Sequence, residues 1–298
     1  MLVYYVSSTV FKATTAEHTM IKINNLSFGY NQSSNLFNNL SLSLEQGGIC
    51  GLLGKNGSGK TSLLKVIAGL IFPSQGSCQV MGMAPQQRRP SFLQELYFLP
   101  EDIYAPPLTA DDYVKFYAPF YPKFDQTLLQ NCLQEFDLPR DKPLSNLSHG
   151  QKKKFLIAFG LATHCKLFIL DEPSNGLDIP SKAQFRKLLA STISDERLFI
   201  ISTHQVHDVE NLIDTVVILD EGKIILQQKL FEIAKRLAIV QQQTEPNLNT
   251  CLYYEKHLAG YTVVTVNTNN QDTHMDLEIL FNAILANKIR IQQIFTRD

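Results

Sequence analysis

Gly54-Lys-Asn-Gly-Ser-Gly-Lys-Thr61 is the stretch of sequence that decides the fold. It follows the apolar run Ile49–Leu53, which suits a fully buried strand, and it precedes a segment that we expect to be helical from Lys60 to about Gly69. Glycines at these spacings allow successive backbone N–H groups to turn inward and surround phosphate oxygens. A strand, a glycine-rich turn and a helix in this order predict a phosphate-binding loop (P-loop) within an α/β fold.

The side chains of this loop suit different parts of a nucleoside triphosphate. The Lys60 ammonium would bridge the terminal phosphates as a point charge, and the Thr61 hydroxyl would ligate Mg²⁺. The start of the helix adds its dipole to the attraction for the anion. The alternative, a glycine-rich turn without a ligand, fits the flanking strand and helix less well. The candidate nucleotide contacts of the segment are Gly54, Asn56, Gly57, Ser58, Gly59, Lys60, Thr61 and Ser62.

Two carboxylates follow a second apolar run, Leu167–Leu170. Asp171 stands where it would reach Mg²⁺, usually through a water molecule. Glu172 lies one residue further along and can face the water that attacks the γ-phosphate, a general-base role that contributes on the order of 10²–10⁴-fold. Pro173 makes a sharp exit from the strand, which favours this role over a pair of solvated acids at a strand end.

Strand-like and helix-like segments alternate along the rest of the chain, which predicts a mostly parallel sheet covered on both faces. Two further strands near the start, Ile21–Phe28 and Leu40–Leu44, alternate with one face buried. Past Asp220-Glu-Gly222 a hairpin strand, Lys223–Leu226, is expected. The other predicted strands are Leu167–Leu170, Leu198–Ile201 and Val216–Leu219, and the helices are Gln151–Thr163, Ser181–Ile193 and Val206–Leu212.

Residues of about 102–150 differ in pattern from the alternating strands and helices around them, and we predict that they form a helical insert within the α/β domain. Thr109 with Asp112 forms a plausible capping pair, and Asp125 could cap a second helix. Residues 1–19 lack the basic start and apolar core of a secretion signal, so we expect a disordered extension, with Met20 as a candidate for the true start.

A main domain of residues 20–240 and a small α/β appendage of residues 241–298 are expected. Gln241–Pro246 has the composition of a linker, and Thr262–Val266 alternates as a strand. Leu277, Leu280, Phe281 and Ile284 recur at helical spacing, and Ile289 with Ile291 indicates a last strand.

Composition limits the partners. The chain has 298 residues, with 27 Lys and Arg against 28 Asp and Glu, so no overall basic field favours nucleic acid. No apolar run reaches the roughly 18 residues of a membrane-spanning helix, so action at a membrane would require a separate spanning protein. The scattered cysteines suit a reducing cytosol and are expected to be small buried hydrophobes: Cys50, Cys78, Cys132, Cys165 and Cys251.

Lys152-Lys-Lys154 is the one basic cluster of the sequence. We interpret it as a solvated helix face. The alternative is contact with phosphate or with a membrane surface.

With its motifs in this order, the chain resembles the nucleotide-binding subunit of ATP-binding cassette (ABC) transporters over roughly Ile21–Leu226. Leu147-Ser-His-Gly-Gln151 resembles the family's signature segment. The resemblance implies that Ser148, the Gly150 backbone and the start of the Gln151 helix contact the γ-phosphate held by a second subunit. His149 departs from the usual glycine, and it either points to solvent or tunes closure of the dimer.

Four further positions take their roles from the same resemblance. Ser174-Asn-Gly-Leu-Asp178 resembles the D-loop, which would carry Asp178 to the dimer interface, and His204 matches the switch histidine that contacts the γ-phosphate. Tyr30 fits the ring that stacks on adenine, with Phe28 as the alternative. Glu101 replaces the Q-loop glutamine and would accept a hydrogen bond from a Mg²⁺-bound water; a similar substitution in one exporter branch favours an exporter.

The resemblance implies an ATP-hydrolysing subunit that works as a dimer. ATP, bound with Mg²⁺, would close two identical or sibling cassettes, and hydrolysis would reopen them. The motion would drive a separate transmembrane permease, with this subunit peripheral on the cytoplasmic face of the cell membrane. The alternatives are an importer subunit and a soluble ABC ATPase of translation or DNA repair, although the single cassette and the lack of a heptad run disfavour the soluble class.

Overall fold

The computed structural model describes residues 19–31, 34–139, 141–268 and 274–296. The expected disordered extension, apart from Thr19, lies outside the described residues. Thr19 itself opens the first strand, β1 (Thr19–Phe28), so regular structure begins one residue before Met20.

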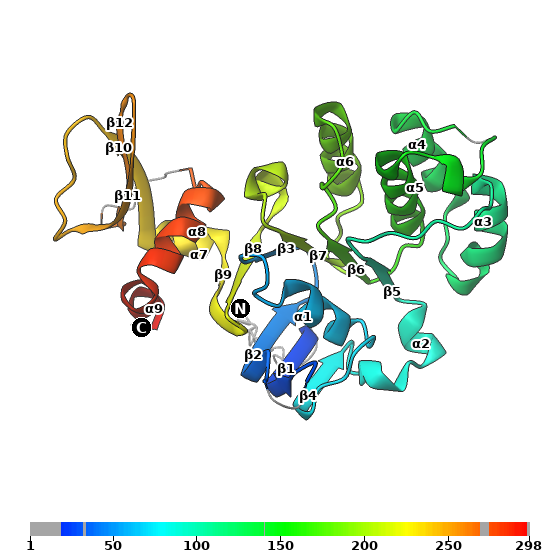
Figure 1. The fold of residues 1–298 in the computed structure, drawn as a ribbon, viewed down its shortest axis with the longest axis horizontal. Helices are drawn as coiled ribbons and strands as arrows, with labels where there is room; N and C mark the ends of the chain where they lie inside the picture. Colours follow the sequence, from blue (N-terminus) through cyan, green and yellow to red (C-terminus); the bar gives the residue numbers. More distant parts are fainter. Residues whose placement is uncertain (1–18, 32–33, 140, 269–273, 297–298) are drawn as a thin grey trace, which may run out of the picture.

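A six-stranded sheet forms the centre of the molecule, in the order β5-β6-β7-β3-β8-β9 (Figure 1). Neighbouring strands from β5 to β8 pair in parallel, and β9 pairs antiparallel with β8 as the predicted hairpin. The strands are β3 (Ile49–Leu53), β5 (Leu96–Leu99), β6 (Leu167–Asp171), β7 (Leu198–Thr203), β8 (Thr215–Asp220) and β9 (Lys223–Lys229). The predicted mostly parallel sheet is therefore confirmed.

An antiparallel sheet of order β2-β1-β4 covers one face of this sheet together with helix α1 (Lys60–Ile67). Its other strands are β2 (Phe37–Glu45) and β4 (Gln75–Val80). Ile23 of β1 pairs with Leu42 of β2, and both side chains are buried, because the apolar members of each alternating strand share one face. The two sheets and α1 enclose one continuous hydrophobic core. Short turns, η1 (Pro85–Gln87) and α2 (Pro90–Leu93), lead from β4 to β5.

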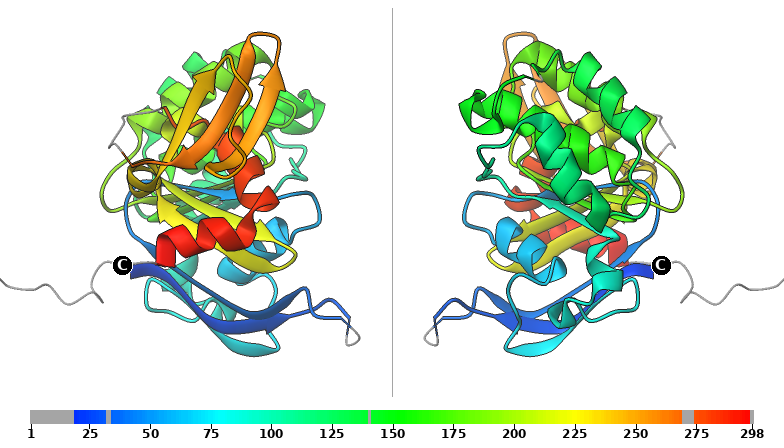
Figure 2. Two further views of the ribbon diagram at one scale, coloured as in Figure 1. Left: turned by 90° about the vertical axis from the view of Figure 1, so that its left-hand side faces the viewer. Right: turned by 90° about the vertical axis from the view of Figure 1, so that its right-hand side faces the viewer.

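The opposite face carries α5 (His149–Ala162) and α6 (Ile179–Ser191), with the smaller helices α3 (Ala110–Tyr117) and α4 (Gln126–Glu135) beyond α5 (Figures 1 and 2). The predicted caps are confirmed: Thr109 accepts a hydrogen bond from the Asp112 N–H, and Asp125 accepts one from the Leu128 N–H. Two 3₁₀ turns, η2 (Ala118–Phe120) and η3 (Leu144–Asn146), complete this helical part.

Gly160 of α5 packs against an aromatic cluster, so Gly160→Ala is expected to destabilise the fold. A Cβ at Gly160 would meet Tyr97 Cε1 at 2.3 Å and Phe168 Cε2 at 2.6 Å. Overpacking a core costs typically about 1–3 kcal/mol, which outweighs the roughly 1 kcal/mol by which Ala favours a helix interior. Denaturant unfolding should show this loss for Gly160→Ala and a change within about 0.5 kcal/mol for Lys152→Ala on the same helix. A more stable Gly160→Ala protein would contradict the packing argument.

The predicted helix over Val206–Leu212 is wrong. The segment forms two 3₁₀ turns, η4 (Val206–Asp208) and η5 (Glu210–Leu212). Val209 between them has φ −136°, which breaks the helix, and its side chain is buried in the core.

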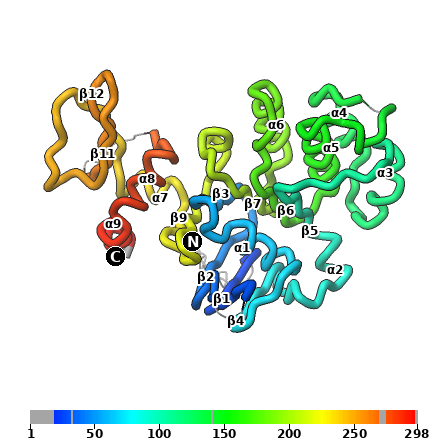
Figure 3. Tube along the Cα trace, in the orientation of Figure 1, coloured from blue at the N-terminus to red at the C-terminus, as the bar shows by residue number. Residues whose placement is uncertain are grey.

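The C-terminal part forms a small α/β unit beside β9 (Figures 2 and 3). Its antiparallel sheet has the order β10-β12-β11. Its elements are α7 (Leu230–Arg236), β10 (Leu237–Gln242), β11 (Cys251–His257), β12 (Gly260–Val266), α8 (Leu277–Ala286) and α9 (Lys288–Thr296). The strand at Thr262–Val266 and the helix through Leu277 are confirmed.

Two expectations for this unit are wrong. Gln241 and Gln242 belong to β10, paired with Thr262 and Tyr261, so the linker composition of this segment hides the end of a strand. The last strand, predicted from Ile289 and Ile291, is helix α9 instead. The reason is helical spacing: Ile291 is buried and Ile294 and Phe295 pack beside it, whereas Ile289 is 74% exposed.

Candidate active site

A cleft of about 750 Å³ opens where β3, β6 and β7 end, at the carboxyl edge of the parallel strands. Open α/β sheets bind their ligands at this edge, because the loops that follow each strand converge there. The lining contains Tyr30, Asn31, Ser34, Asn35, Leu36, Asn56, Gly57, Gly59, Lys60, Thr61, Ser62, Glu101, Glu172 and His204.

The P-loop folds around the amine of Lys60, which is buried. Its Nζ donates to the Gly54 carbonyl at 2.8 Å and to the Lys55 carbonyl at 3.3 Å. Gly59 has φ +107°, and a Cβ there would meet Phe37 Cε1 at 2.7 Å, so both conformation and space require glycine. Burial lowers the pKa of Lys60, although nearby carboxylates, Glu172 first, oppose this effect. Ser58 is buried, with its Oγ unpartnered among the described residues.

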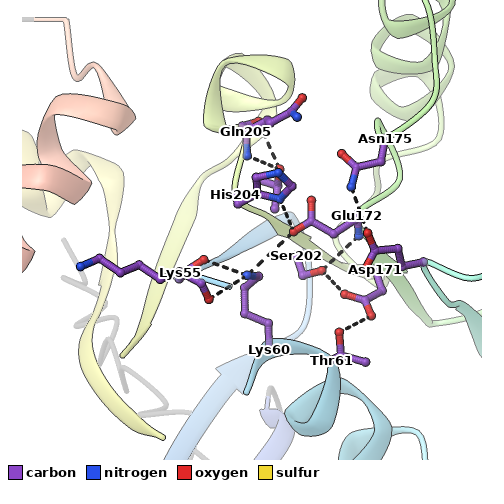
Figure 4. Close-up of polar contacts among 12 residues, drawn as sticks. Lys55, Lys60, Thr61, Asp171, Glu172, Asn175, Ser202, His204 and Gln205 are labelled. Atoms are coloured by element: carbon purple, nitrogen blue, oxygen red, sulfur yellow. Dashed lines mark hydrogen bonds and ion pairs between the residues drawn. The ribbon is translucent and has the colours of Figure 1, made fainter. Parts of the chain in front are cut away.

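Asp171 ends β6 and joins the P-loop to the neighbouring strand. Its Oδ2 accepts a hydrogen bond from Thr61 Oγ1 at 2.7 Å, and its Oδ1 accepts one from Ser202 Oγ of β7. Both contacts are visible in Figure 4. A carboxylate and a hydroxyl at hydrogen-bond distance form a pair of hard oxygen donors facing the loop.

The Thr61 hydroxyl and the Asp171 carboxylate fit Mg²⁺ as it is bound in sites that also hold a nucleotide. Mg²⁺ prefers oxygen ligands and is usually bound through one or two protein groups, with water and substrate phosphates completing its shell. Thr61 and Asp171 supply such groups, and Glu101 on the cleft wall could reach the shell through water. Among the described residues there is no group of three or more His, Cys, Asp or Glu side chains that could hold a metal ion.

Glu172 is held in an unusual backbone conformation, with φ +48°. Its N–H donates to the Ser202 carbonyl at 3.1 Å. Its Oε1 lies 2.8 Å from His204 Nδ1 and 3.8 Å from Lys60 Nζ. Figure 4 marks both contacts with dashed lines. Its Oε2 is buried and has no hydrogen-bond partner among the described residues, and Glu172 is one of the residues that line the cleft.

Two side chains from different segments form the rim of the cleft. The Tyr30 ring is 64% exposed, and its hydroxyl lies 3.0 Å from Ser62 Oγ. Phe28, the alternative adenine partner, is only 8% exposed and meets the Tyr30 ring edge to face, so it serves as a core support for that ring. Glu101 Oε1 accepts a hydrogen bond from Asn175 Nδ2 at 3.1 Å, which links the segment after β5 to the turn after β6.

The signature and D-loop residues do not line this cleft. Ser148 and Gln151 form a reciprocal capping box at the start of α5, with Ser148 Oγ accepting from the Gln151 N–H and Gln151 Oε1 accepting from the Ser148 N–H. Gly150 lies in the first turn of that helix. Asp178 caps α6, and the hydrogen bonds from Ser181 lower the pKa of its carboxyl. His149 is exposed and lies against Gly176 of the D-loop segment.

Sequence reasoning missed several residues of the site. Asn31, Ser34, Asn35 and Leu36 line the cleft, although no motif of the sequence pointed to them; their place directly after Tyr30 was the available signal. The expected solvated face at Lys152–Lys154 is wrong for its middle member. Lys153 is fully buried, because the Glu172–Asn175 turn lies over it.

Comparisons with known proteins agree with this geometry. A family model described as ABC transporter matches residues 37–175. The lantibiotic transport ATP-binding protein SrtF of Streptococcus pyogenes is 32% identical over 216 residues, which cover 70% of this chain and 91% of that protein. This chain belongs to the family of ABC transporter ATP-binding proteins.

Further relatives place this ABC subunit among similar proteins. The SkfA peptide export ATP-binding protein SkfE of Bacillus subtilis is 31% identical, over 71% of this chain and 89% of that protein. A solved structure of the ATP binding subunit of an ABC transporter superposes with a TM-score of 0.63 at 24% identity, covering 72% of this chain and 92% of that chain. At that identity the likeness shows the fold alone.

The ABC subunit thus binds and hydrolyses ATP to power transport. These relatives are named as transport proteins, so the alternative of a translation or repair factor has no support among them. Within the described ranges, no helix combines the length and the apolar character needed to cross a membrane.

Proposed function

We propose that this ABC subunit powers export through a separate permease, with Glu172 as the general base and His204 as its partner. The observation that carries the proposal is that His204 and Lys60 meet the Glu172 carboxylate beside the P-loop. His204 Nδ1 lies 2.8 Å and Lys60 Nζ lies 3.8 Å from Glu172 Oε1. These groups come from three different strand ends and converge on the place where a γ-phosphate would lie.

ATP binding follows from the lining of the cleft. The P-loop N–H groups and the start of α1 attract the phosphates, and Lys60 leaves its carbonyl partners to bridge them. Mg²⁺, held by Thr61 and Asp171, would neutralise charge on the phosphate oxygens. The exposed Tyr30 ring offers a flat surface to adenine, and the other cleft residues, Asn56, Gly57, Gly59 and Ser62, surround the phosphates.

Hydrolysis requires a water aligned with the γ-phosphate. The unpartnered Oε2 of Glu172 would accept a proton from this water, while the Oε1 contact with His204 fixes the orientation of the carboxylate. His204 would also donate to the γ-phosphate. Glu101 replaces a neutral glutamine here, so it adds negative charge to a site already holding two carboxylates.

A second subunit is needed to complete each site. Ser148, Gly150, Gln151 and Asp178 lie outside the cleft, and the start of a helix such as α5 attracts anions through its dipole. Two copies, or this chain and a sibling, would therefore pair head to tail around two ATP molecules. ATP would bind the closed dimer much more tightly than the open one, which shifts the population toward closure.

The permease and the direction of transport are the least direct parts of the proposal. Exposed aromatic side chains on the helical insert, Tyr104, Phe116 and Phe120, offer a surface for a membrane partner on the cytoplasmic face. Export is supported by Glu101 and by the printed name of the SkfE relative.

Isolation of the tagged chain from its own membranes tests this function. We expect a multi-span membrane protein to co-purify, and we expect ATP hydrolysis per chain to rise with chain concentration. Co-purification with ribosomes or DNA would contradict transport. A strict monomer that hydrolyses ATP at the full rate would contradict the shared site.

Tyr30→Ala is expected to weaken ATP binding by about 5- to 150-fold, because stacking of a base on an aromatic ring contributes roughly 1–3 kcal/mol. Tyr30→Phe keeps the ring and loses only the hydroxyl contact with Ser62, so it should bind within about threefold of the wild type. Titration with ATP and with inorganic triphosphate measures both effects. Equal losses for the two ligands would show that Tyr30 does not contact the base.

A further inference from the structure

Lys153 is a buried lysine that the proposed chemistry does not use. It lies on α5, and its side chain is 0% exposed. Its Nζ donates to the Glu172 carbonyl at 3.0 Å and to the Asn175 carbonyl at 2.9 Å. Burial lowers the pKa of Lys153, and the nearby carboxylates of Glu101, Glu172 and Asp171 oppose this effect. A lysine buried at this depth is rare unless a specific interaction compensates for the lost hydration.

The turn that Lys153 binds carries the proposed general base. Glu172 has a left-handed φ of +48°, a conformation that a residue with a side chain adopts only when its surroundings hold it. Ser202 of β7 holds the Glu172 N–H, and Lys153 of α5 holds the Glu172 carbonyl. The backbone of Glu172 is therefore held at both of its peptide groups, and this fixes the point from which the carboxylate extends. The turn bond from the Asn175 N–H to the same carbonyl is longer, at 3.3 Å.

The second contact extends this arrangement across the turn. Lys153 binds the Asn175 carbonyl, and the Asn175 side chain donates to Glu101 on the cleft wall. The Lys153 ammonium thus binds both ends of the Glu172–Asn175 turn. It also supports Asn175, whose side chain connects the turn to Glu101. No carboxylate among the described residues lies within ion-pair distance of Lys153, so its charge acts on the turn through backbone carbonyls.

We propose that Lys153 is a positioning residue for ATP hydrolysis, holding the Glu172–Asn175 turn so that the Glu172 carboxylate faces the attacking water. This inference rests on the proposed role of Glu172 as the general base. Lys153 does not contact the cleft, and its effect passes through the backbone of Glu172.

Replacement of Lys153 by residues of graded hydrogen-bonding capacity tests the inference in the full chain, within the assembly that hydrolyses ATP. Lys153→Met removes the donors at similar length and is expected to lower kcat by about 10²-fold, because small displacements of a reacting group have effects of this size. Lys153→Gln keeps two donors on a shorter side chain and should lower kcat by only about tenfold. The KM for ATP should stay within about twofold in both variants.

Lys154→Met is the matched control, since Lys154 donates to the Phe136 carbonyl from another face of the same helix. We expect it to keep the wild-type kcat. In a Glu172→Gln background, Lys153→Met should cause no further loss of residual turnover, because both changes act on one group. Thermal unfolding measured in parallel shows whether each variant is folded.

Several results would overturn the proposal. The first is a wild-type kcat in Lys153→Met. The second is a fall in kcat of this variant that is matched by a rise in its KM for ATP. The third is a further loss of residual turnover when Lys153→Met is added to Glu172→Gln. If Lys153→Met does not fold, Lys153→Gln decides alone: reduced kcat at unchanged KM supports positioning, and unchanged kcat refutes it. Full turnover in Glu172→Gln would instead refute the proposed base, whereas an inactive Glu172→Gln beside a fully active Lys153→Met refutes only the role of Lys153.

Discussion

Glu172→Gln is expected to hydrolyse ATP about 10²–10⁴-fold more slowly than the wild type while binding ATP equally well. The amide cannot take a proton from water, but it keeps the size of the carboxylate and removes a negative charge from beside the γ-phosphate. The bound ATP would therefore persist, and the closed dimer should accumulate. Single-turnover hydrolysis, ATP titration and size-exclusion chromatography with ATP measure the three effects.

Glu221→Gln is the control for this prediction, because Glu221 is an exposed glutamate in the β8–β9 turn and is not among the residues that line the cleft. It should match the wild type in all three measurements. Normal turnover in Glu172→Gln would mean that another group takes the proton. Loss of ATP binding in the same variant would mean that Glu172 contributes to the ground-state complex.

Lys60→Met is expected to weaken ATP binding by about 10- to 150-fold, because hydrogen bonds to charged groups contribute roughly 1.5–3 kcal/mol. Burial already disfavours the ammonium in the absence of ATP, as the lowered pKa of Lys60 indicates. An apolar side chain of similar length should therefore leave thermal stability unchanged or higher. The combination of weaker binding and undiminished stability distinguishes a phosphate contact from a structural lysine.

Lys65→Met, in the last turn of the same helix, is the matched control and should bind ATP as the wild type does. Calorimetric titration with ATP and a thermal melt without nucleotide provide both measurements. A Lys60→Met protein that binds ATP normally but melts earlier would reverse the assignment.

The P-loop and the two carboxylates after β6 could be predicted from sequence because each depends on a few consecutive residues and the end of one strand, whereas the role expected for His204 follows from the family resemblance. The conformation of such a segment depends mainly on its own residues. Gly59, for example, adopts its positive φ because glycine has no Cβ. The structure brings Lys60, Glu172 and His204 together, although their sequence positions are far apart, because β3, β6 and β7 are neighbours in one parallel sheet.

The environment of Lys153 could not be predicted in this way. Nothing in the sequence distinguishes the middle one of three consecutive lysines from the other two. Lys153 differs in its burial because the turn after β6 lies over it. Helix α9 was missed for a related reason. The helical spacing of its apolar residues is visible only when Ile294 and Phe295 are considered together with Ile291. These three residues pack into a core whose other members come from distant parts of the chain.

The C-terminal unit is joined to the ATPase by shared packing as well as by chain connection. Leu277, Leu280 and Ile284 of α8 belong to the same hydrophobic core as Val206 and Val209, which follow His204 in the chain. His207 in that turn also pairs with Glu278 at 2.5 Å. A truncated protein engineered to end near residue 240 would thus lose the covering of the segment that carries His204. Crystallisation or screening efforts that need a minimal catalytic fragment should retain α8.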